Sequence, residues 1–295
     1  MRPKTYRVND NYFKKWSHNM AYILGLWFSD GCITSKSVFA ITLHERDRKL
    51  LQDVLAEMAS NHVVTKNRRC SVIRINSADI YNDIIKLGGK ERKSLDCRFP
   101  NVPSEYLPGF IRGLWDGDGC ITNSKWRGYD YYRASLYSGS KQFMCDAKRI
   151  INTNIPLTKG SIGTRTYRRG TKVNGCVLKR DSVVYVLSLG INDTRRLRDY
   201  IYCNDGLKMG RKYDKFVEAG DIKFHKPVTT ADYETASKYS WGLKLNSKNE
   251  WFQYFRKHTK PNYIPANPYE RYKNCGWVNW ASWLGNKDES EKFEV

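Results

Sequence analysis

Apolar and polar residues alternate with two different periods along the first hundred positions, and these periods predict helices separated by pairs of strands. Spacings of three and four mark the helical segments, and strict alternation marks the strands. We predict the order helix, two strands, helix, two strands, helix over residues 21–30, 31–34, 38–43, 46–59, 62–69, 70–76 and 77–88. Ser77 or Asp79 lies near the start of the last helix and Gly88 lies beyond its end, as expected for helix caps.

The same order is predicted a second time, with longer strands, over the next hundred positions. A helix at 109–118 precedes segments with strand or helix patterns at 119–124, 131–140, 141–153, 161–169, 182–190 and 192–202. The basic stretch between the two series contains Pro100 and Pro103, which is typical of a linker. We therefore expect a first domain over residues 1–102, a second over 103–221 and a separate segment over 222–295.

Both series begin with nearly the same sequence, which indicates an internal duplication. Residues 21–34 read AYILGLWFSDGCIT and residues 109–122 read GFIRGLWDGDGCIT. The shared pattern G-L-W-x-x-D-G-C-I-T therefore recurs 88 positions later. A repeat this specific predicts two related domains in one chain.

Small residues recur at every fourth position of both repeated helices and so lie on one helix face. They are Ala21, Gly25, Ser29, Gly109, Gly113 and Gly117. A face of small residues lets two helices approach closely. We therefore expect the two helices to pack against each other, while the other faces, with Ile23, Leu24, Leu26 and Trp27 in the first copy, are buried in the cores.

Both repeated helices end in Asp-Gly, at Asp30 and Asp118. The glycines, Gly31 and Gly119, are expected to be left-handed C-terminal caps. The negative end of a helix is an unfavourable place for a carboxylate, and two carboxylates brought together there repel unless a cation intervenes. A single Asp-Gly after a helix usually marks only a turn. The duplication on packed helices instead predicts a shared magnesium site, because Mg²⁺ prefers oxygen ligands.

Composition points to a nucleic acid as the partner. The chain has 51 Lys+Arg against 30 Asp+Glu, a formal net charge of +21, which predicts attraction to a polyanion. No apolar run is long enough to cross a membrane, and we expect no membrane partner. The eight cysteines form no CxxC pair, which argues against a zinc ribbon. Because no secretion signal is recognisable, we expect reduced thiols in an intracellular compartment, either cytoplasm or an organellar matrix.

The duplicated segments resemble the LAGLIDADG motif of homing endonucleases in their single-chain, two-motif form. Residues 25–31 and 113–119 match the GLIDADG part, the second copy more closely. The stretch FPNVPSEYLPGFIRGLWDGDG is similar to the family's lead-in to its second motif, and the resemblance covers about residues 15–218. It implies an α+β fold of two pseudo-symmetric αββαββα domains, whose saddle-shaped antiparallel sheets lie in the DNA major groove.

The resemblance also implies the chemistry. Asp30 and Asp118 would bind Mg²⁺, with Mn²⁺ as an alternative, and activate water for one DNA strand each. A monomer would cut double-stranded DNA at a long asymmetric site and leave short 3′ overhangs. Lys93 and Lys212 follow the closing helices and are candidates for polarising the phosphate or the water, although plain phosphate contact is an equal alternative. Glu45, together with Ser138, is a candidate for positioning water.

One departure from the family pattern is Phe28, where an acid is common. This position is usually not the metal ligand, so the departure does not predict an inactive protein. Asp116 occupies the same position in the second copy, and we interpret it as a structural or capping residue.

Strand side chains that point into the groove would read the DNA sequence. The segment 161–180 is rich in basic residues and contains no acid. A solvated charged hairpin is the alternative interpretation, but DNA contact is favoured. The candidate DNA-binding residues are Lys66, Arg68, Arg69, Arg74, Lys125, Arg127, Arg133, Arg165, Tyr167, Arg168, Arg169, Lys172, Lys179 and Arg180.

Residues 222–295 belong to neither repeat and are dense in aromatic side chains. Trp277, Trp280 and Trp283 are spaced by three, after a bend rich in proline. The ending resembles a short repeat unit of phage-integrase-type proteins. We expect a small, mainly helical module in which the aromatic residues form a core, with an accessory DNA contact as an addition.

Two other functions are compatible with the same pattern. The chain could be a maturase that binds its own intron RNA, or a DNA-binding regulator that no longer cuts. Loss of a motif aspartate would favour the regulator, and both aspartates are present.

Overall fold

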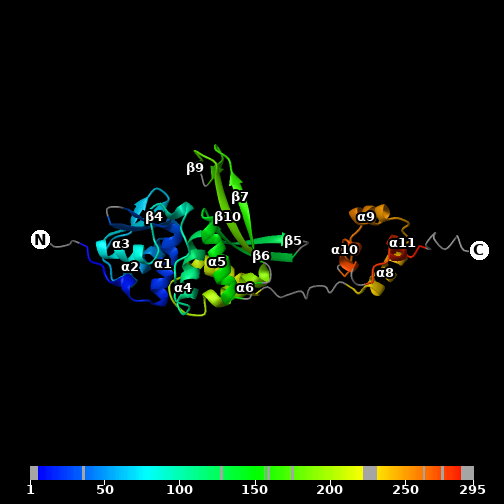
Figure 1. Cartoon of the computed structure of the whole chain (residues 1–295), viewed down its shortest axis with the longest axis horizontal. Coiled ribbons are helices and arrows are strands. Elements are labelled where there is room, and N and C mark those ends of the chain that lie inside the picture. Colours follow the sequence, from blue (N-terminus) through cyan, green and yellow to red (C-terminus); the bar gives the residue numbers. More distant parts are fainter. Residues whose placement is uncertain are drawn as a thin grey trace, which may run out of the picture. The chain divides into compact units, whose positions relative to one another are not determined.

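The computed structural model describes residues 6–34, 37–126, 129–155, 157, 160–173, 176–221, 231–261, 263–273 and 276–286. These residues form two compact units, Met1–Ile222 and Lys223–Val295 (Figure 1). Both halves of the duplication lie in the first unit and share one hydrophobic core. The expected start of the C-terminal module at residue 222 lies one position from the division between the units.

The first half of the duplication builds one antiparallel four-stranded sheet with helices on one face. Its strands are ordered β1-β2-β4-β3. Ser77 caps the last helix by accepting a hydrogen bond from the backbone N–H of Ile80. The third strand is shorter than expected, because residues 62–64 and 68–69 lie outside it. The elements are α1 (His18–Asp30), β1 (Gly31–Thr34), β2 (Val38–His44), α2 (Arg48–Glu57), β3 (Thr65–Asn67), β4 (Cys70–Asn76) and α3 (Ala78–Lys86).

The second half repeats this order, which confirms the α+β fold with pseudo-symmetric halves. Its strands are ordered β5-β6-β10-β7, the same arrangement in chain order as in the first sheet. An additional short ladder, β8 (Lys172–Val173) with β9 (Cys176–Val177), was not predicted. The other elements are α4 (Leu107–Asp118), β5 (Gly119–Trp126), β6 (Tyr129–Ser138), α5 (Lys141–Asn154), β7 (Ser161–Tyr167), β10 (Ser182–Leu189), α6 (Ile191–Ile201) and α7 (Gly210–Asp221).

Helices α1 and α4 cross through their small residues, as the sequence predicts, and lie side by side in Figure 1. A Cβ atom on Gly25 would lie 2.1 Å from the carbonyl oxygen of Phe110. Gly113 has the reciprocal contact, since its Cβ would lie 2.1 Å from the carbonyl oxygen of Tyr22. The backbones touch at these points, and the remaining faces of α1 are buried in the core.

The glycines after the two aspartates are not left-handed caps, and this prediction was wrong. Gly31 has φ −100° and Gly119 has φ −87°, so both are extended and lead directly into strands. The physical reason for glycine is space. A Cβ on Gly31 would lie 2.3 Å from the Trp27 ring, and one on Gly119 would lie 2.4 Å from the Trp115 ring. The repeated tryptophan and the repeated glycine are therefore one packing unit.

Each sheet of the first unit has a helix-covered face and an open face. The covered face of the first sheet carries Phe39, Ile41 and Ile73, all fully buried. On the second sheet, Leu136 and Leu187 pair across β6 and β10 and are buried in the same way. Strands β7 and β10 project beyond the rest of this unit in Figure 1, with β9 at their far end.

The C-terminal unit is helical in its described residues, as expected. Its helices are α8 (Tyr233–Gly242), α9 (Lys248–Lys257), α10 (Pro268–Tyr272) and α11 (Trp280–Leu284). Trp251, Tyr272 and Trp283 form its buried centre, and Trp277 and Trp280 pack against them. The tryptophans spaced by three therefore belong to a small core, as the sequence predicts.

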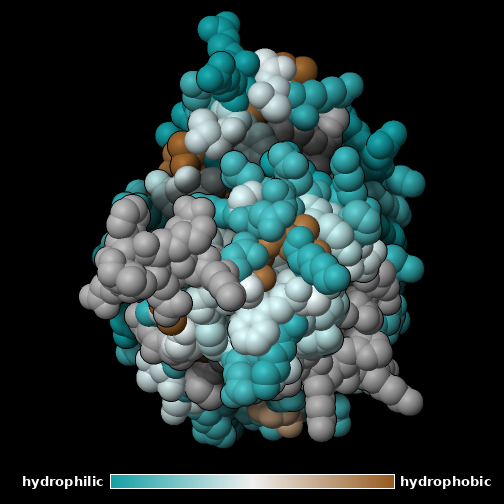
Figure 2. Space-filling view, turned by 90° about the vertical axis from the view of Figure 1, so that its right-hand side faces the viewer, coloured by the Kyte–Doolittle hydropathy of each residue, from teal (hydrophilic) through white to brown (hydrophobic). Residues whose placement is uncertain are grey.

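The face of the molecule shown in Figure 2 is mainly polar. Figure 2 shows hydrophobic residues only singly or in small groups among hydrophilic ones on the face that it presents. Within the described ranges, no helix combines the length and the apolar character needed to cross a membrane.

Candidate metal centre and nucleic-acid interface

Asp30 and Asp118 end the two packed helices, close enough for the charge of one to affect the other. Asp30 Oδ2 lies 2.9 Å from the position that a Cβ on Gly117 would occupy. Solvent reaches the Asp118 side chain, but surrounding protein atoms restrict its hydration. This restriction first, and the negative charge of Asp30 second, raise the pKa of Asp118 to about 7. Burial also raises the pKa of Asp30, against the opposing charges of Lys212 and Lys93.

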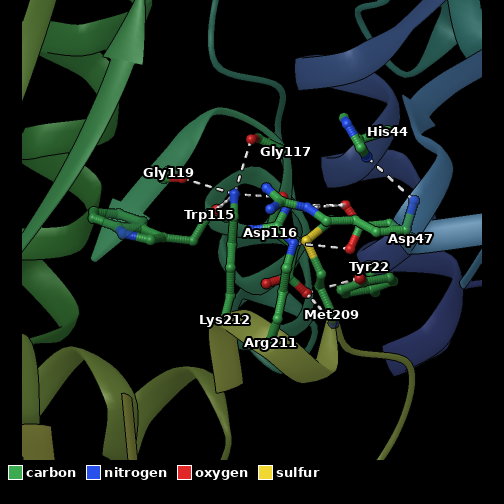
Figure 3. A network of polar contacts seen from close by, with 11 residues as sticks. Tyr22, His44, Asp47, Trp115, Asp116, Gly117, Gly119, Met209, Arg211 and Lys212 are labelled. Atoms are coloured by element: carbon green, nitrogen blue, oxygen red, sulfur yellow. Dashed lines mark hydrogen bonds and ion pairs between the residues drawn. The ribbon is translucent and has the colours of Figure 1, made fainter. Parts of the chain in front are cut away.

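Lys212 is buried at the C-terminal end of α4, where its ammonium group meets four backbone carbonyls (Figure 3). Its Nζ atom lies 2.6–3.0 Å from the carbonyl oxygens of Trp115, Asp116, Gly117 and Gly119. An ammonium group has three N–H donors, so these acceptors saturate it. Burial lowers the pKa of Lys212, and the Asp116 carboxylate opposes this most strongly. The side chain therefore caps α4 rather than standing free for a phosphate contact.

Lys93 has the corresponding place at the end of α1 but is held less tightly. It begins a short 3₁₀ helix, Lys93–Leu95, and is also buried. Its Nζ atom donates to the carbonyl oxygen of Ser29 at 3.4 Å and lies 5.1 Å from the centre of the Trp27 ring. Burial lowers the pKa of Lys93, and the charge of Asp118 opposes this most strongly. Lys93, Asp118 and Ser138 line a shared recess of about 320 Å³.

The lysines and aspartates therefore form two centres, each drawn from both halves of the duplication. Lys93 comes from the first half and interacts most strongly with Asp118 of the second. Lys212 comes from the second half and is the charge that most opposes the raised pKa of Asp30 in the first. Each motif aspartate therefore has beside it a lysine contributed by the other half.

Asp116 is structural, in agreement with its interpretation from the sequence. Its Oδ2 atom accepts a hydrogen bond from the Tyr22 hydroxyl at 2.8 Å and from the backbone N–H of Met209 at 2.7 Å. Burial raises the pKa of Asp116 to about 6, although these two donors hold it down. The carboxylate thus ties α1, α4 and the segment before α7 together.

Sequence reasoning missed an ion pair next to Asp30. Arg211, one position before Lys212, donates from Nε and Nη2 to the two carboxylate oxygens of Asp47, both at 2.9 Å (Figure 3). Asp47 precedes α2, and its negative charge contributes to the raised pKa of Asp30. Asp47 lies three positions after the end of β2, in the short 3₁₀ helix Glu45–Asp47, and its partner lies 164 positions away, so no local pattern in the sequence indicates the pair.

Glu45, the residue proposed from the sequence for this region, points to β4 instead. It accepts a hydrogen bond from the Ser71 hydroxyl at 2.7 Å. Ser138, its counterpart in the second half, lines the recess beside Asp118. Of the two candidates for positioning water, Ser138 is therefore the one that shares a recess with a motif aspartate.

The open face of the second sheet carries several of the candidate DNA-binding residues. Cross-strand partners point to the same face of a sheet. Arg133 pairs with Thr122, and Arg165 pairs with Val184, on the face opposite the buried leucines. Tyr131, Arg133 and Arg165 line a recess of about 550 Å³ on this face. Tyr167 lies on the same face by register.

The other candidate residues are exposed but differ in direction. Arg74 lies on the open face of β4, between the buried Ile73 and Ile75. Lys66 pairs with Ser71 on the helix-covered side, at the edge of the sheet, and Lys125 is likewise on the covered side by register. Arg127 lies outside the described residues. The remaining candidates are exposed: Lys172 lies in β8, and the others lie in turns or loops, Arg68, Arg69, Arg168, Arg169, Lys179 and Arg180.

A family model for the LAGLIDADG-like domain matches residues 105–201, which span most of the second half. The match does not extend to the C-terminal unit, whose resemblance to an integrase-type repeat stays a prediction. No protein of curated function matches the sequence.

Several solved structures are similar to the chain. Meganuclease I-SmaMI bound to uncleavable DNA is 14% identical, with 67% of this chain and 89% of that chain covered and a TM-score of 0.43. The LAGLIDADG meganuclease I-AabMI bound to uncleaved DNA is 16% identical, with coverages of 70% and 90% and a TM-score of 0.43. The LAGLIDADG homing endonuclease I-GzeII with its DNA target is 10% identical, with coverages of 82% and 98% and a TM-score of 0.43.

Proposed function

We propose that this chain, in which residues 105–201 are a LAGLIDADG-like domain, is a site-specific endonuclease of double-stranded DNA, of the homing type. One observation carries the proposal. Asp30 and Asp118 meet at the ends of two packed helices, and each has a buried lysine of the other half beside it. A basic chain with a net charge of +21 supplies the attraction to DNA.

The two carboxylates fit a hard divalent cation. Restricted hydration first, and the negative charge of Asp30 second, raise the pKa of Asp118 to about 7, so a cation between the two carboxylates would relieve their repulsion. In the described part of the chain, no cluster of three or more His, Cys, Asp or Glu side chains could hold a metal, so water and DNA oxygens would complete the coordination. We assign Mg²⁺ to this site, with Mn²⁺ able to replace it. The bound ion would supply Lewis acidity and an activated water.

The chain's own residues prepare the site in three ways. Asp30 and Asp118 would hold the cation, one carboxylate for each DNA strand. Lys93 and Lys212 keep positive charge beside these carboxylates and fix the ends of α1 and α4 through backbone carbonyls. The close helix contact at Gly25 and Gly113 sets the separation of the two ends.

Binding of the duplex would use the exposed basic residues of both sheets. Arg74, Arg133 and Arg165 are on open sheet faces and are suited to base edges, whereas the exposed turn residues are suited to phosphates. The two sheets carry different side chains, so the target would be asymmetric. We further propose that the protein acts as a monomer and leaves short 3′ overhangs.

The test starts from an inactive binding protein. The variant Asp30→Asn/Asp118→Asn selects duplexes from a randomised DNA library, and wild-type protein is then incubated with them and Mg²⁺. We expect double-strand cleavage by the wild type. Each single Asp→Asn variant should cut at least one strand more than about a hundredfold more slowly, because even outer partners of metal ligands cost 10–100-fold.

The outcome separates the competing functions. Tight binding of a specific duplex without cleavage by the wild type would identify a regulator. Selection of structured RNA in preference to duplex DNA, in a parallel library, would identify a maturase.

A further inference from the structure

The two composite centres are supported by different chemistry, although their halves are related by duplication. Tyr22 and Asp116 form a hydrogen bond of 2.8 Å on one side of the helix pair. The corresponding positions on the other side are Phe110 and Phe28, whose rings meet edge to face at 5.6 Å. The polar side is next to Lys212, whose ammonium group donates to the Asp116 carbonyl, and on the aromatic side Phe28 lines the same recess as Lys93.

The polar side continues into α7 and across to the first half. Asp116 holds the backbone N–H of Met209, directly before α7, and Lys212 lies one turn further on. Arg211 reaches from the same turn to Asp47 at the start of α2 (Figure 3). The ion pair therefore connects the second half to the first, beside Asp30.

The geometry of this ion pair is well defined. Two parallel N–H···O contacts of 2.9 Å fix the plane of the guanidinium group as well as its position. The Asp47 side chain is only 6% exposed, whereas the Arg211 side chain is 37% exposed. The buried Asp47 carboxylate therefore holds the Arg211 guanidinium in place, while part of the guanidinium remains accessible to a ligand at the surface. Both charges act on Asp30.

The other centre has no equivalent. The position that corresponds to Arg211 is Arg92, which is exposed and has left-handed backbone with φ 53°. Among the described residues Arg92 has no ion-pair partner. A different ion pair, Arg98–Asp146 at 2.9 Å, joins the segment before α4 to α5, and its Arg side chain is 67% exposed.

We infer that Arg211 supplies a second cation to the Asp30 centre alone, with Asp47 as its positioning residue, so that the two strands of the duplex are cut by unequal centres. The inference rests on the proposed nuclease function. A guanidinium held beside a metal-binding carboxylate is suited to a phosphate oxygen, because its remaining N–H donors are free to form charge-assisted hydrogen bonds. Loss of Arg211 or of Asp47 should therefore slow the cleavage of one DNA strand and leave the cleavage of the other unchanged.

The experiment measures the two strands separately. A duplex target with different labels on its strands is cut under single-turnover conditions by wild type, Arg211→Gln and Asp47→Asn. We expect both variants to slow one and the same strand by about 10–100-fold, the range for outer partners of metal sites, with the other strand unchanged. The variant Asp30→Asn identifies the affected strand, and Arg211→Lys should restore only part of the rate because it cannot bind bidentately.

Two further measurements distinguish a role of the Asp47–Arg211 pair in cleavage from a purely structural one. DNA affinity in Ca²⁺ should stay within a factor of three for both variants, so that the loss lies in the rate. Unfolding of the metal-free proteins should show that Asp47→Asn and Arg211→Gln are not additive in the double variant, because they remove one shared contact. Arg98→Gln is the matched control and should change neither strand.

The results separate this inference from the proposed function. If wild type cuts neither strand, the nuclease proposal fails, while the unfolding cycle still reports whether the pair is coupled. If wild type cuts and the variants slow both strands equally, or slow neither, the assignment of Arg211 to one centre is wrong. Additive unfolding effects would overturn the positioning role of Asp47.

Discussion

At the scale of single residues, the protein places charges where burial penalises them. Asp116 is only 1% exposed, and its Oδ2 atom accepts hydrogen bonds from the Tyr22 hydroxyl and the backbone N–H of Met209. Lys212 is 6% exposed and saturated by carbonyls at a helix end. Both residues hold backbone segments next to Asp118 and Asp30. The free energy lost in burying their charges is therefore connected with keeping the proposed metal centre in place.

The buried Asp116 makes stability depend on pH. Its pKa is raised to about 6 in the folded state, so between about pH 4 and 6 the folded protein retains a proton that the unfolded chain has lost. The unfolded state then binds fewer protons, and the contribution of Asp116 to stability must fall as pH rises through this range. Urea unfolding of the metal-free protein at pH 4 to 7 measures this dependence.

The variant Asp116→Asn provides the control for this prediction. An amide oxygen can still accept from Tyr22 and Met209, and no charge is buried. We expect the decline between pH 4 and 6 to become shallower, with stability above pH 6 equal to or greater than that of the wild type. A variant with the same pH profile as the wild type would contradict the raised pKa of Asp116.

At this scale the duplication gives a local signal for Asp30 and Asp118, and the structure places both at the ends of the packed helices. Lys93 and Lys212 follow the closing helices and lie beside these aspartates, but the roles expected for the four residues in cleavage stay predictions. The Asp47–Arg211 pair joins positions 164 apart and leaves no pattern in either segment. The pair can be recognised only in the folded structure, because it forms where the two halves of the duplication contact each other.

At the scale of elements, the helix pair α1–α4 determines the arrangement of both centres. Backbone contact at Gly25 and Gly113 leaves no room for a side chain on either helix. Because the protein interior is closely packed, moving α1 and α4 apart at these glycines would also move the helix ends, where the aspartates lie. The small-residue face is therefore a requirement of the site as well as of stability.

Substitution of Gly113 by alanine tests this requirement. The new Cβ would lie 2.1 Å from the carbonyl oxygen of Tyr22, so the helices must separate. We expect a loss of about 1–3 kcal/mol in the free energy of unfolding, typical of an overpacked core, despite the better helix propensity of alanine. Denaturant unfolding measures the difference.

A matched control is Gly163→Ala, because nothing lies within 4 Å of a Cβ at this position in β7. Its effect should stay within about 0.5 kcal/mol. Equal losses in the two variants would mean that the helix contact does not limit space at Gly113.

Element order was predictable from periodicity, but the chain geometry at the helix ends was not. The sequence predicted the helices of the repeated order, the hairpins and a cap at Ser77 or Asp79, but it did not predict α7, which carries Arg211 and Lys212. It misassigned Gly31 because a glycine after a helix usually indicates left-handed backbone, whereas here the Trp27 ring excludes a Cβ from extended backbone. The contact between Gly31 and the Trp27 ring depends on how the side chain packs, and the residue types alone do not reveal it.

At the scale of the whole molecule, two compact units have separate hydrophobic cores. The first contains both halves of the duplication, and the second is built around Trp251, Tyr272 and Trp283. The C-terminal unit carries more Lys and Arg than Asp and Glu in its described residues. Its charge is compatible with the accessory DNA contact expected from the sequence.

Removal of residues 223–295 tests this division. Because the first unit has its own core, its thermal unfolding midpoint should change by less than about 2 °C, which corresponds to under 1 kcal/mol for a domain of this size. DNA binding by the shortened protein should depend less steeply on salt, by about 0.9 in the log–log slope for each phosphate that the C-terminal unit neutralises. An unchanged slope would exclude the accessory contact, and a large fall in the midpoint would contradict independent units.

The composite origin of the two centres limits how the halves can be reused. A hybrid that takes one half from a relative would gain a sheet with different exposed side chains, but its lysine would face a different aspartate and its motif helix a different partner. Compatibility along α1 and α4, and across Asp47 and Arg211, would decide which hybrids are functional. The two halves repeat one motif, but the contacts between them would require that they be exchanged as a matched set.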